Sequence, residues 1–130
     1  LETLFVRMKR YAADMFDGKN ISSRFEFPET ETGIQLSMTQ RRDLYLVFKE
    51  AVNNLVKYSG ATEALVKLTT DNQQLQLLIT DNGKGFDRTS LRAGNGLHNM
   101  EQRAAAAGGS LFIRSAPGEG TRVELQLKLS

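Results

Sequence analysis

The stretch Asp81-Asn82-Gly83-Lys84-Gly85-Phe86 constrains the fold of this chain most, because it abruptly ends an apolar run over residues 75–80. Asn-Gly is a strong turn signal, and two glycines separated by one residue allow positive φ angles and a close approach of a ligand to the backbone. A surface hairpin turn would explain this stretch taken alone. However, Gly94-Asn95-Gly96 opens a new helix nine residues after Gly85. The two glycine stretches together favour a ligand-binding function over a simple turn.

The composition suits one globular domain with a single core, since the chain has 130 residues of which 40% are hydrophobic. A net charge of +2 indicates no strong field for nucleic acid or membranes. The absence of cysteine excludes a disulfide framework and a thiolate metal site. No apolar run reaches the roughly 18 residues that span a bilayer, and no signal-peptide pattern is present. Because Leu1 is not an initiator methionine, we expect a fragment of a longer protein.

Three segments have the apolar spacing of amphipathic helices. The predicted helices are Leu1–Asp17, Ser37–Tyr58 and Leu97–Ala107. Gly18 is a stop signal for the first helix. Ser37 and Gln40 form a capping box for the second helix, and Gly108-Gly109 is a C-terminal cap for the third.

Alternating apolar and polar residues predict the strands. The predicted strands are Ile21–Phe27, Thr62–Thr70, Gln73–Thr80, Leu111–Ser115 and Thr121–Leu129. The first ends at Pro28, so we interpret it as an edge strand. One mixed, mostly antiparallel sheet that is covered on one face by helices buries these patterns most economically. The sequence therefore predicts an α+β fold, a two-layer α/β sandwich.

Glu50, Asn54 and Lys57 occupy positions i, i+4 and i+7 of the longest predicted helix, and so line up beside its apolar stripe. A carboxylate, an amide and an ammonium group in one row at the edge of a core are unusual. A solvated helix face with a Glu–Lys pair would also explain this row when it is taken alone. We expect the row and both glycine stretches to border one cavity on the helical side of the sheet.

Four motifs follow one another along the chain. They are Glu50-x-x-x-Asn54-x-x-Lys57, Asp81-x-Gly83-x-Gly85-Phe86, Gly94-x-Gly96-Leu97-x-Asn99-Met100 and Gly118-x-Gly120-Thr121. In this order and at these spacings they resemble the ATP-binding catalytic domain of bacterial sensor histidine kinases, in the superfamily shared with DNA gyrase, Hsp90 and MutL. The resemblance covers essentially the whole chain and implies a Bergerat-type fold.

Two further features resemble the kinase branch that pairs with NarL-type response regulators. They are the short Phe86-to-Gly94 lid and the run that ends at Arg103. Residues 1–17 resemble the end of that family's dimerisation helix, or a linker. This leaves residues 18–130 as the catalytic ATP-binding domain.

The resemblance also implies roles for single residues. Asp81 would accept a hydrogen bond from the adenine amino group, with support from Thr121. Asn54 would bind Mg²⁺, a hard ion that takes oxygen ligands, and Glu50 would help to hold the metal or to activate the acceptor. Further nucleotide contacts would come from Lys57 near the phosphates, from Gly83 and Gly85 at the pocket floor and lid hinge, and from Gly94, Gly96 and Leu97 at the phosphates.

The implied activity is that of a protein histidine kinase, which positions Mg-ATP for γ-phosphoryl transfer to a histidine absent from this chain. The implied partners are an upstream dimerisation domain that carries this histidine, and a cognate response regulator. We expect no nucleic-acid partner, a cytoplasmic location, a homodimeric full-length protein and a monomeric fragment. Membrane anchoring of the full-length protein stays open.

Two other functions remain as alternatives: a nucleotide-sensing module without catalysis, and a hydrolase of the gyrase or Hsp90 type. The presence of all the nucleotide-binding positions argues against the first, and the short lid argues against the second. A P-loop is excluded because the chain has no Gly-Lys-Ser/Thr. His98, the only histidine, lies inside the second glycine motif, so we do not predict it to be the phosphoacceptor.

Overall fold

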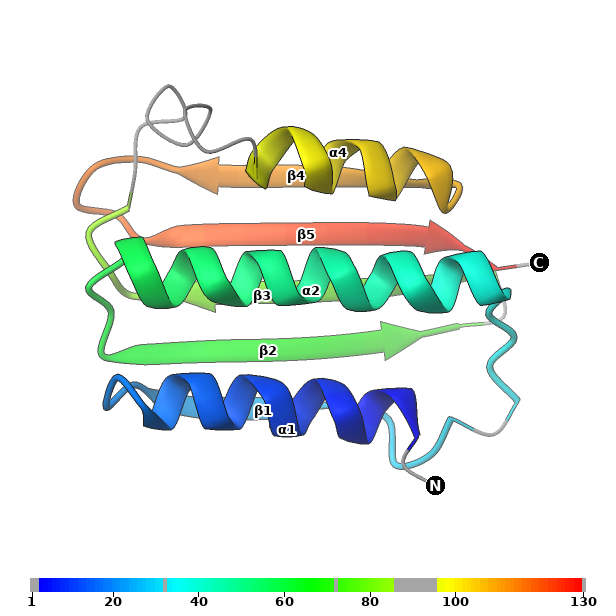
Figure 1. The fold of residues 1–130 in the computed structure, drawn as a ribbon, viewed down its shortest axis with the longest axis horizontal. Helices are drawn as coiled ribbons and strands as arrows, with labels where there is room; N and C mark the ends of the chain where they lie inside the picture. The colour runs from blue at the N-terminus through cyan, green and yellow to red at the C-terminus, as the bar shows by residue number, and fades with distance from the viewer. Residues whose placement is uncertain (1–2, 32, 72, 86–95, 130) are drawn as a thin grey trace.

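The computed structural model describes residues 3–31, 33–71, 73–85 and 96–129, which form two layers (Figure 1). One layer is a five-stranded sheet with the strand order β1-β2-β3-β5-β4. The described helices lie side by side on one face of this sheet. The helices are α1 (Leu4–Asp17), α2 (Met38–Tyr58) and α4 (Gly96–Ala106), and the strands are β1 (Ser22–Glu26), β2 (Glu63–Thr70), β3 (Gln74–Asp81), β4 (Gly109–Ser115) and β5 (Thr121–Lys128).

The sheet is mixed and mostly antiparallel, which confirms the predicted fold class. β1 pairs with β2 in parallel, and the other neighbouring strands pair antiparallel. A parallel pair needs a crossover connection, and α2 provides it. Figure 1 shows that the end of β3, the start of β5, the end of α2 and the start of α4 lie at the same end of the molecule. Residues that are far apart in the sequence therefore meet there.

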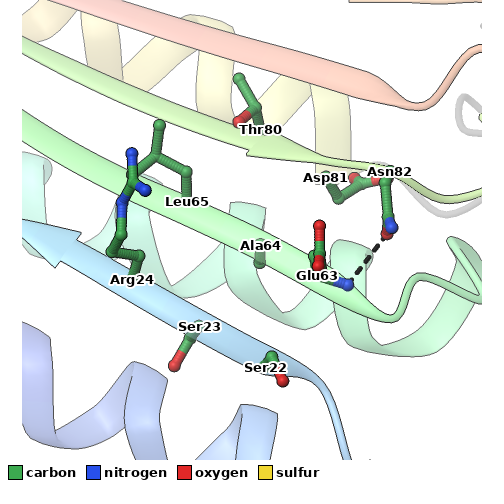
Figure 2. Close-up of a pocket in the computed structure, with 9 residues that line it drawn as sticks. All are labelled: Ser22, Ser23, Arg24, Glu63, Ala64, Leu65, Thr80, Asp81 and Asn82. Carbon is green, nitrogen blue, oxygen red and sulfur yellow. Dashed lines mark hydrogen bonds between the residues drawn. The ribbon is translucent and has the colours of Figure 1, made fainter.

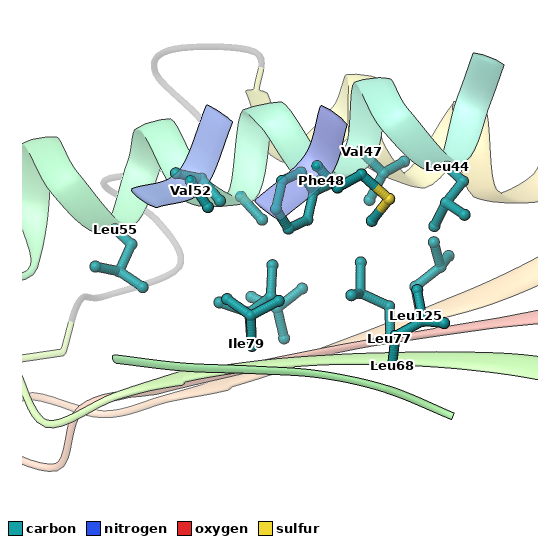
Figure 3. Packing of buried hydrophobic residues seen from close by; sticks show 14 of the residues in the cluster. Leu44, Val47, Phe48, Val52, Leu55, Leu68, Leu77, Ile79 and Leu125 are labelled. Atoms are coloured by element: carbon teal, nitrogen blue, oxygen red, sulfur yellow. The ribbon is translucent and has the colours of Figure 1, made fainter. Parts of the chain in front are cut away.

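The core lies between α2 and the centre of the sheet (Figure 3). The apolar stripe of α2 faces the inward-pointing side chains of three strands. The labelled residues of this contact are Leu44, Val47, Phe48, Val52, Leu55, Leu68, Leu77, Ile79 and Leu125, all of them buried. Burial of each such side chain contributes roughly 1.5–3 kcal/mol. This packing makes α2 the fixed support of the helical layer.

Helix α1 packs beside α2 and over β1, and it shares the same hydrophobic core. Its buried side chains are Leu4, Phe5, Met8, Ala12 and Phe16. The Tyr11 hydroxyl group donates a hydrogen bond of 2.7 Å to Asn53 Oδ1 of α2. The predicted domain boundary at residue 17 stays a prediction.

The helix ends follow the sequence signals closely. Ser37 and Gln40 form the predicted capping box at the start of α2, and Gly18 is the C-cap of α1. The second glycine of the predicted α4 cap behaves differently, because Gly109 already belongs to β4. A Cβ atom at Gly109 would overlap the carbonyl group of Gln126. The strand thus starts at Gly109 instead of Leu111, where it passes β5 too closely for a side chain.

The other face of the sheet carries the outward-pointing residues of the strands, among them Lys67, Gln76 and Glu124. They alternate with core residues along each strand, as expected for a sheet with one covered face. Among the helices that the structure describes, none is long and apolar enough to cross a membrane.

Phe48→Ala should lower the free energy of unfolding by about 3–5 kcal/mol, because it leaves a cavity under α2. The matched control is Phe112→Ala on the uncovered face, where the side chain is 54% exposed. The control should change stability by no more than about 0.5 kcal/mol. Urea denaturation of both variants would measure this. Equal losses would contradict the central place of α2 in the core.

Candidate functional site

A narrow cavity lies between α2, α4 and the end of the sheet where β3 stops. Its volume is about 20 Å³, which is room for about one water molecule. It is lined by Ala51, Asn54, Leu55, Ser59, Ile79, Asp81, Met100, Ile113, Thr121 and Val123. Three residues of the predicted site, Asn54, Asp81 and Thr121, are among them. They come from three different elements, which the fold brings together on the helical side of the sheet.

Asp81 and Thr121 form the polar floor of this cavity. They are cross-strand partners in β3 and β5, and the alternation along both strands places them on the same face as Ile79 and Val123. Asp81 Oδ1 accepts a hydrogen bond from the Gly83 amide at 2.7 Å. Burial raises the pKa of Asp81, against the opposing effect of the Gly83 and Thr121 backbone amides. A carboxylate that is partly removed from water favours a ligand that donates a hydrogen bond.

The loop after β3 is held by its backbone. The Lys84 amide donates to the Ser59 carbonyl group at the end of α2, with a distance of 2.7 Å, and the Lys84 carbonyl group accepts from the Gly118 amide. A Cβ atom at Gly83 would overlap the Ser59 carbonyl group. Gly85 has φ +71°, and a Cβ atom there would overlap the Ala116 carbonyl group. Both positions therefore require glycine. The Lys84 side chain is exposed.

Asn82 fixes the same loop to the start of β2, a role that the sequence analysis missed. Its Oδ1 atom accepts from the backbone amides of Thr62 at 3.0 Å and Glu63 at 2.9 Å, and its Nδ2 atom donates to Thr62 Oγ1 at 2.9 Å. Figure 2 shows the contact with Glu63. The only sequence signal at Asn82 was the Asn-Gly pair, which predicts a turn but not these partners.

The hollow drawn in Figure 2 is larger, about 440 Å³, and lies on the sheet face away from the helices. Arg24, Leu65 and Thr80 point outward around it. Neither Asn54 nor Thr121 lines it. We therefore place the candidate site in the narrow cavity, where the predicted residues meet.

Glu50 and the start of α4 border the cavity. A Cβ atom at Gly96, the first residue of α4, would overlap the Glu50 carboxylate and would lie 3.6 Å from Asn54 Nδ2. The fold thus joins the first and third sequence motifs. The positive end of the α4 macrodipole points toward these side chains.

The Glu50 carboxylate at this border fits a hard divalent ion such as Mg²⁺, which prefers oxygen ligands. Asn54 turns its Nδ2 atom toward Gly96, so its side-chain amide would have to rotate for Oδ1 to bind an ion on that side. Within residues 3–31, 33–71, 73–85 and 96–129, no group of three His, Cys, Asp or Glu side chains could hold a metal ion. Glu50 and Asn54 alone would therefore leave several positions to other ligands. Phosphate oxygens and water are the usual ones for Mg²⁺.

The other predicted residues lie outside the cavity lining. Lys57 is exposed in the last turn of α2. Leu97 is 2% exposed and belongs to the hydrophobic core. His98 is exposed on α4. Gly94, and the lid predicted from Phe86 to Gly94, lie outside the described residues.

The apolar lining was not predicted as part of the site, although the sequence held a signal for some of it. Ile79 and Val123 stand two residues from Asp81 and Thr121, so strand alternation puts them on the same face. Met100 stands four residues after Gly96, one helical turn along α4. No pattern marked Ser59 or Ile113.

Comparison with known proteins gives a family match over most of the chain. The family model described as histidine kinase-, DNA gyrase B-, and HSP90-like ATPase matches residues 39–130. The chain is 36% identical to the sensor histidine kinase LiaS of Bacillus subtilis over 87 residues, 66% of this chain and 24% of that protein. It is 38% identical to the sensor protein VraS of Staphylococcus aureus over 88 residues, 67% of this chain and 25% of that protein. The chain thus spans about a quarter of the length of these relatives.

Solved structures share the fold. A blue-light activated histidine kinase of Erythrobacter litoralis matches with a TM-score of 0.78 and 16% identity, over 95% of this chain and 41% of that one. The histidine kinase AdeS of Acinetobacter baumannii matches with a TM-score of 0.77 and 17% identity, over 98% of this chain and 64% of that one. The family match extends from α2 to β5 and includes every residue that lines the cavity. The chain therefore belongs to the family of histidine kinase-, DNA gyrase B- and HSP90-like ATPases.

Proposed function

We propose that this chain is the catalytic domain of a sensor histidine kinase and positions Mg-ATP for γ-phosphoryl transfer to a histidine outside the chain. The main support is the meeting of Asn54, Asp81 and Thr121 around one cavity, with Glu50 and Gly96 at its border. The sensor kinases among the relatives support the same activity.

Asp81 is the proposed adenine contact. Its carboxylate lies at the floor of a largely apolar cavity, where a positioned acceptor distinguishes an exocyclic amine from other groups. The Thr121 hydroxyl group lies 2.9 Å from Ser115 Oγ, which also donates to the Gly120 carbonyl group at 3.1 Å. Because the single hydroxyl hydrogen of Ser115 goes to Gly120, the Thr121 hydroxyl group donates to Ser115. The Thr121 oxygen can then accept a hydrogen bond from a ligand. Ile79, Met100 and Val123 would then contact the faces of the base.

Glu50 and Asn54 are the proposed magnesium ligands, through carboxylate and amide oxygens. A bound ion there would supply charge neutralisation for the phosphates, the main requirement of phosphoryl transfer besides positioning. The backbone amide groups at the start of α4, at Gly96, would bind phosphate oxygens. Lys57, one turn after Asn54, would add a positive charge. Leu97 would contribute its backbone, and Gly94 would lie near the same phosphates.

The proposed partners follow from this activity. They are a dimerisation domain that carries the phosphoacceptor histidine, with residues 1–17 as its end or linker, and a response regulator of the NarL type. The full-length protein would be a homodimer with this domain in the cytoplasm. The sensor proteins among the relatives support this assignment.

Asp81→Asn should stabilise the fold and weaken ATP binding. Burial raises the pKa of Asp81 above 3.8, so the folded protein holds this proton more tightly than the unfolded chain. The parent therefore loses stability as the pH rises from about 3.8 to the raised folded-state pKa. The advantage of the variant should be complete above this window and shrink as the pH falls through it. Losing a charged acceptor should weaken ATP binding by about 1.5–3 kcal/mol. Thermal unfolding at several pH values and titration with a fluorescent ATP analogue would measure both effects.

Asp71→Asn is the matched control for this prediction. Backbone amides of Gln73 and Gln74 lower the pKa of Asp71, so its charged form stabilises the fold above its unfolded-state pKa. This variant should lose stability at pH 7, with the loss vanishing as the pH falls through the lowered pKa. Its affinity for ATP should not change. If Asp81→Asn bound ATP as well as the parent, Asp81 would have no adenine contact.

Asn54→Ala should weaken binding of ATP far more in the presence of Mg²⁺ than in a chelator, because the side-chain oxygen acts through the ion. Asn53→Ala is the matched control, since the neighbouring Asn53 amide binds Tyr11 instead. Calorimetric titration with and without Mg²⁺ would separate the two. Equal losses of Asn54→Ala in both conditions would give Asn54 a structural role only.

The isolated chain should bind Mg-ATP as a monomer but incorporate no acid-labile phosphate, because its single histidine, His98, is not the proposed acceptor. Adding a separate dimerisation domain that carries the acceptor should restore transfer. This transfer should be slow, since the effective concentration set by the tether is lost. Transfer of label from γ-labelled ATP would measure it, with His98→Gln alongside. Label on the isolated chain that disappears in His98→Gln would identify His98 as the acceptor and contradict the proposal.

A further inference from the structure

A second polar cluster lies between the first turns of α2 and the end of α4, away from the candidate site. Asp43 Oδ1 accepts hydrogen bonds of 3.3 Å from Arg103 Nη1 and from Arg42 Nε. Gln40 Nε2, on the preceding turn of α2, donates to the carbonyl group of Ala107 at 3.2 Å. Asp43 is 1% exposed and Gln40 is 7% exposed. These contacts clamp the end of α4 to the start of α2.

The clamp and the site are in register along one helix–helix interface. α2 and α4 run antiparallel (Figure 1). Asp43 and Glu50 are seven residues apart on α2, and their respective neighbours Arg103 and Gly96 are also seven residues apart on α4. Seven residues are about two helical turns, or about 10 Å. A slip of α4 by one residue, a shift of about 1.5 Å with a rotation of about 100°, would break the ion pair and move Gly96 away from Glu50.

Stability alone does not account for this clamp. Asp43 Oδ2 is buried and has no hydrogen-bond partner among the residues that the structure describes. A buried carboxylate that is only partly satisfied is costly. Ion pairs of such a carboxylate add little net stability, and here the Arg103 side chain is 42% exposed. Their best-attested use is to fix register. Arg103 suits that use, because its planar guanidinium group bonds in a defined direction.

We propose that Asp43 and Arg103 are positioning residues for the nucleotide site. Their ion pair sets the place of α4 along α2, and thereby holds the first residue of α4, Gly96, against Glu50 and Asn54. The inference rests on the proposed function, because it assumes that this end of α4 receives phosphates. It assigns a role to Arg103, which the sequence motif contained without a function.

The test compares ADP with adenosine, which lacks phosphates. Asp43→Asn keeps the shape of the side chain and removes the charge without leaving an unpaired carboxylate. It should weaken ADP binding by about tenfold, roughly the loss of one hydrogen bond to a charged group, because the start of α4 would no longer be held where the phosphates bind. Its affinity for adenosine should stay near that of the parent. Arg103→Lys, which keeps the charge but loses the planar group, should show the same split, and it repeats the test if Asp43→Asn does not fold.

Tyr11→Phe is the matched control, since it removes a helix–helix hydrogen bond on the opposite flank of α2 and leaves α4 untouched. It should change neither affinity. Calorimetric titration of residues 1–130 with Mg²⁺ present would measure all four proteins. A parent that binds neither ligand would contradict the proposed function. A parent that binds ADP while Asp43→Asn binds it equally well, or loses ADP and adenosine binding alike, would overturn the positioning role alone.

Discussion

The packing of α2 against the sheet is the contact on which the other parts of this domain depend. One stripe of the helix, centred on Phe48, fills the core. Its flanks hold α1 through Asn53 and α4 through Asp43. Near the end of the helix, Asn54 lines the cavity. Just beyond the end, the Ser59 carbonyl group accepts a hydrogen bond from the loop after β3. Because all these contacts are made by one helix, the positions of the site residues depend on how that helix packs against the core.

The site itself is built where regular structure stops and the backbone comes very close to its neighbours. Gly83, Gly85 and Gly96 each lie where a Cβ atom would overlap a carbonyl or carboxylate group. Asp81 is kept partly out of water there, which costs stability at neutral pH. A loss of stability of this kind is common at functional sites, where a residue is kept for its function and not for its contribution to folding. This cost lies at the candidate site, and the hydrophobic cluster between α2 and the sheet is apolar.

Local patterns predicted most of the fold, whereas contacts across the chain escaped them. The alternation in β3 and β5 identified their buried faces, and the Ser37–Gln40 capping box located the start of α2. The start of β4 at Gly109 was missed because it depends on the approach of Gln126 from another strand. Asn82 and Arg103 find their partners 20 and 60 residues away. Rules based on neighbouring residues cannot predict contacts between residues so far apart in the sequence. Of the predicted site residues, Asn54, Asp81 and Thr121 line the cavity, whereas Gly83, Gly85, Lys57 and Leu97 do not. No motif indicated how little space the cavity encloses.

The small volume of the cavity bears on how tightly a nucleotide can bind. Ligand pockets commonly hold about 300–1,000 Å³, whereas this cavity holds about 20 Å³. For a purine to lie among these lining residues, the surrounding side chains would have to move apart. The apparent dissociation constant is then the intrinsic one divided by the fraction of molecules in that wider state. A competent fraction of about 1% would cost about 2.7 kcal/mol of affinity. Any change that favours the wider state would raise the affinity without touching a single nucleotide contact.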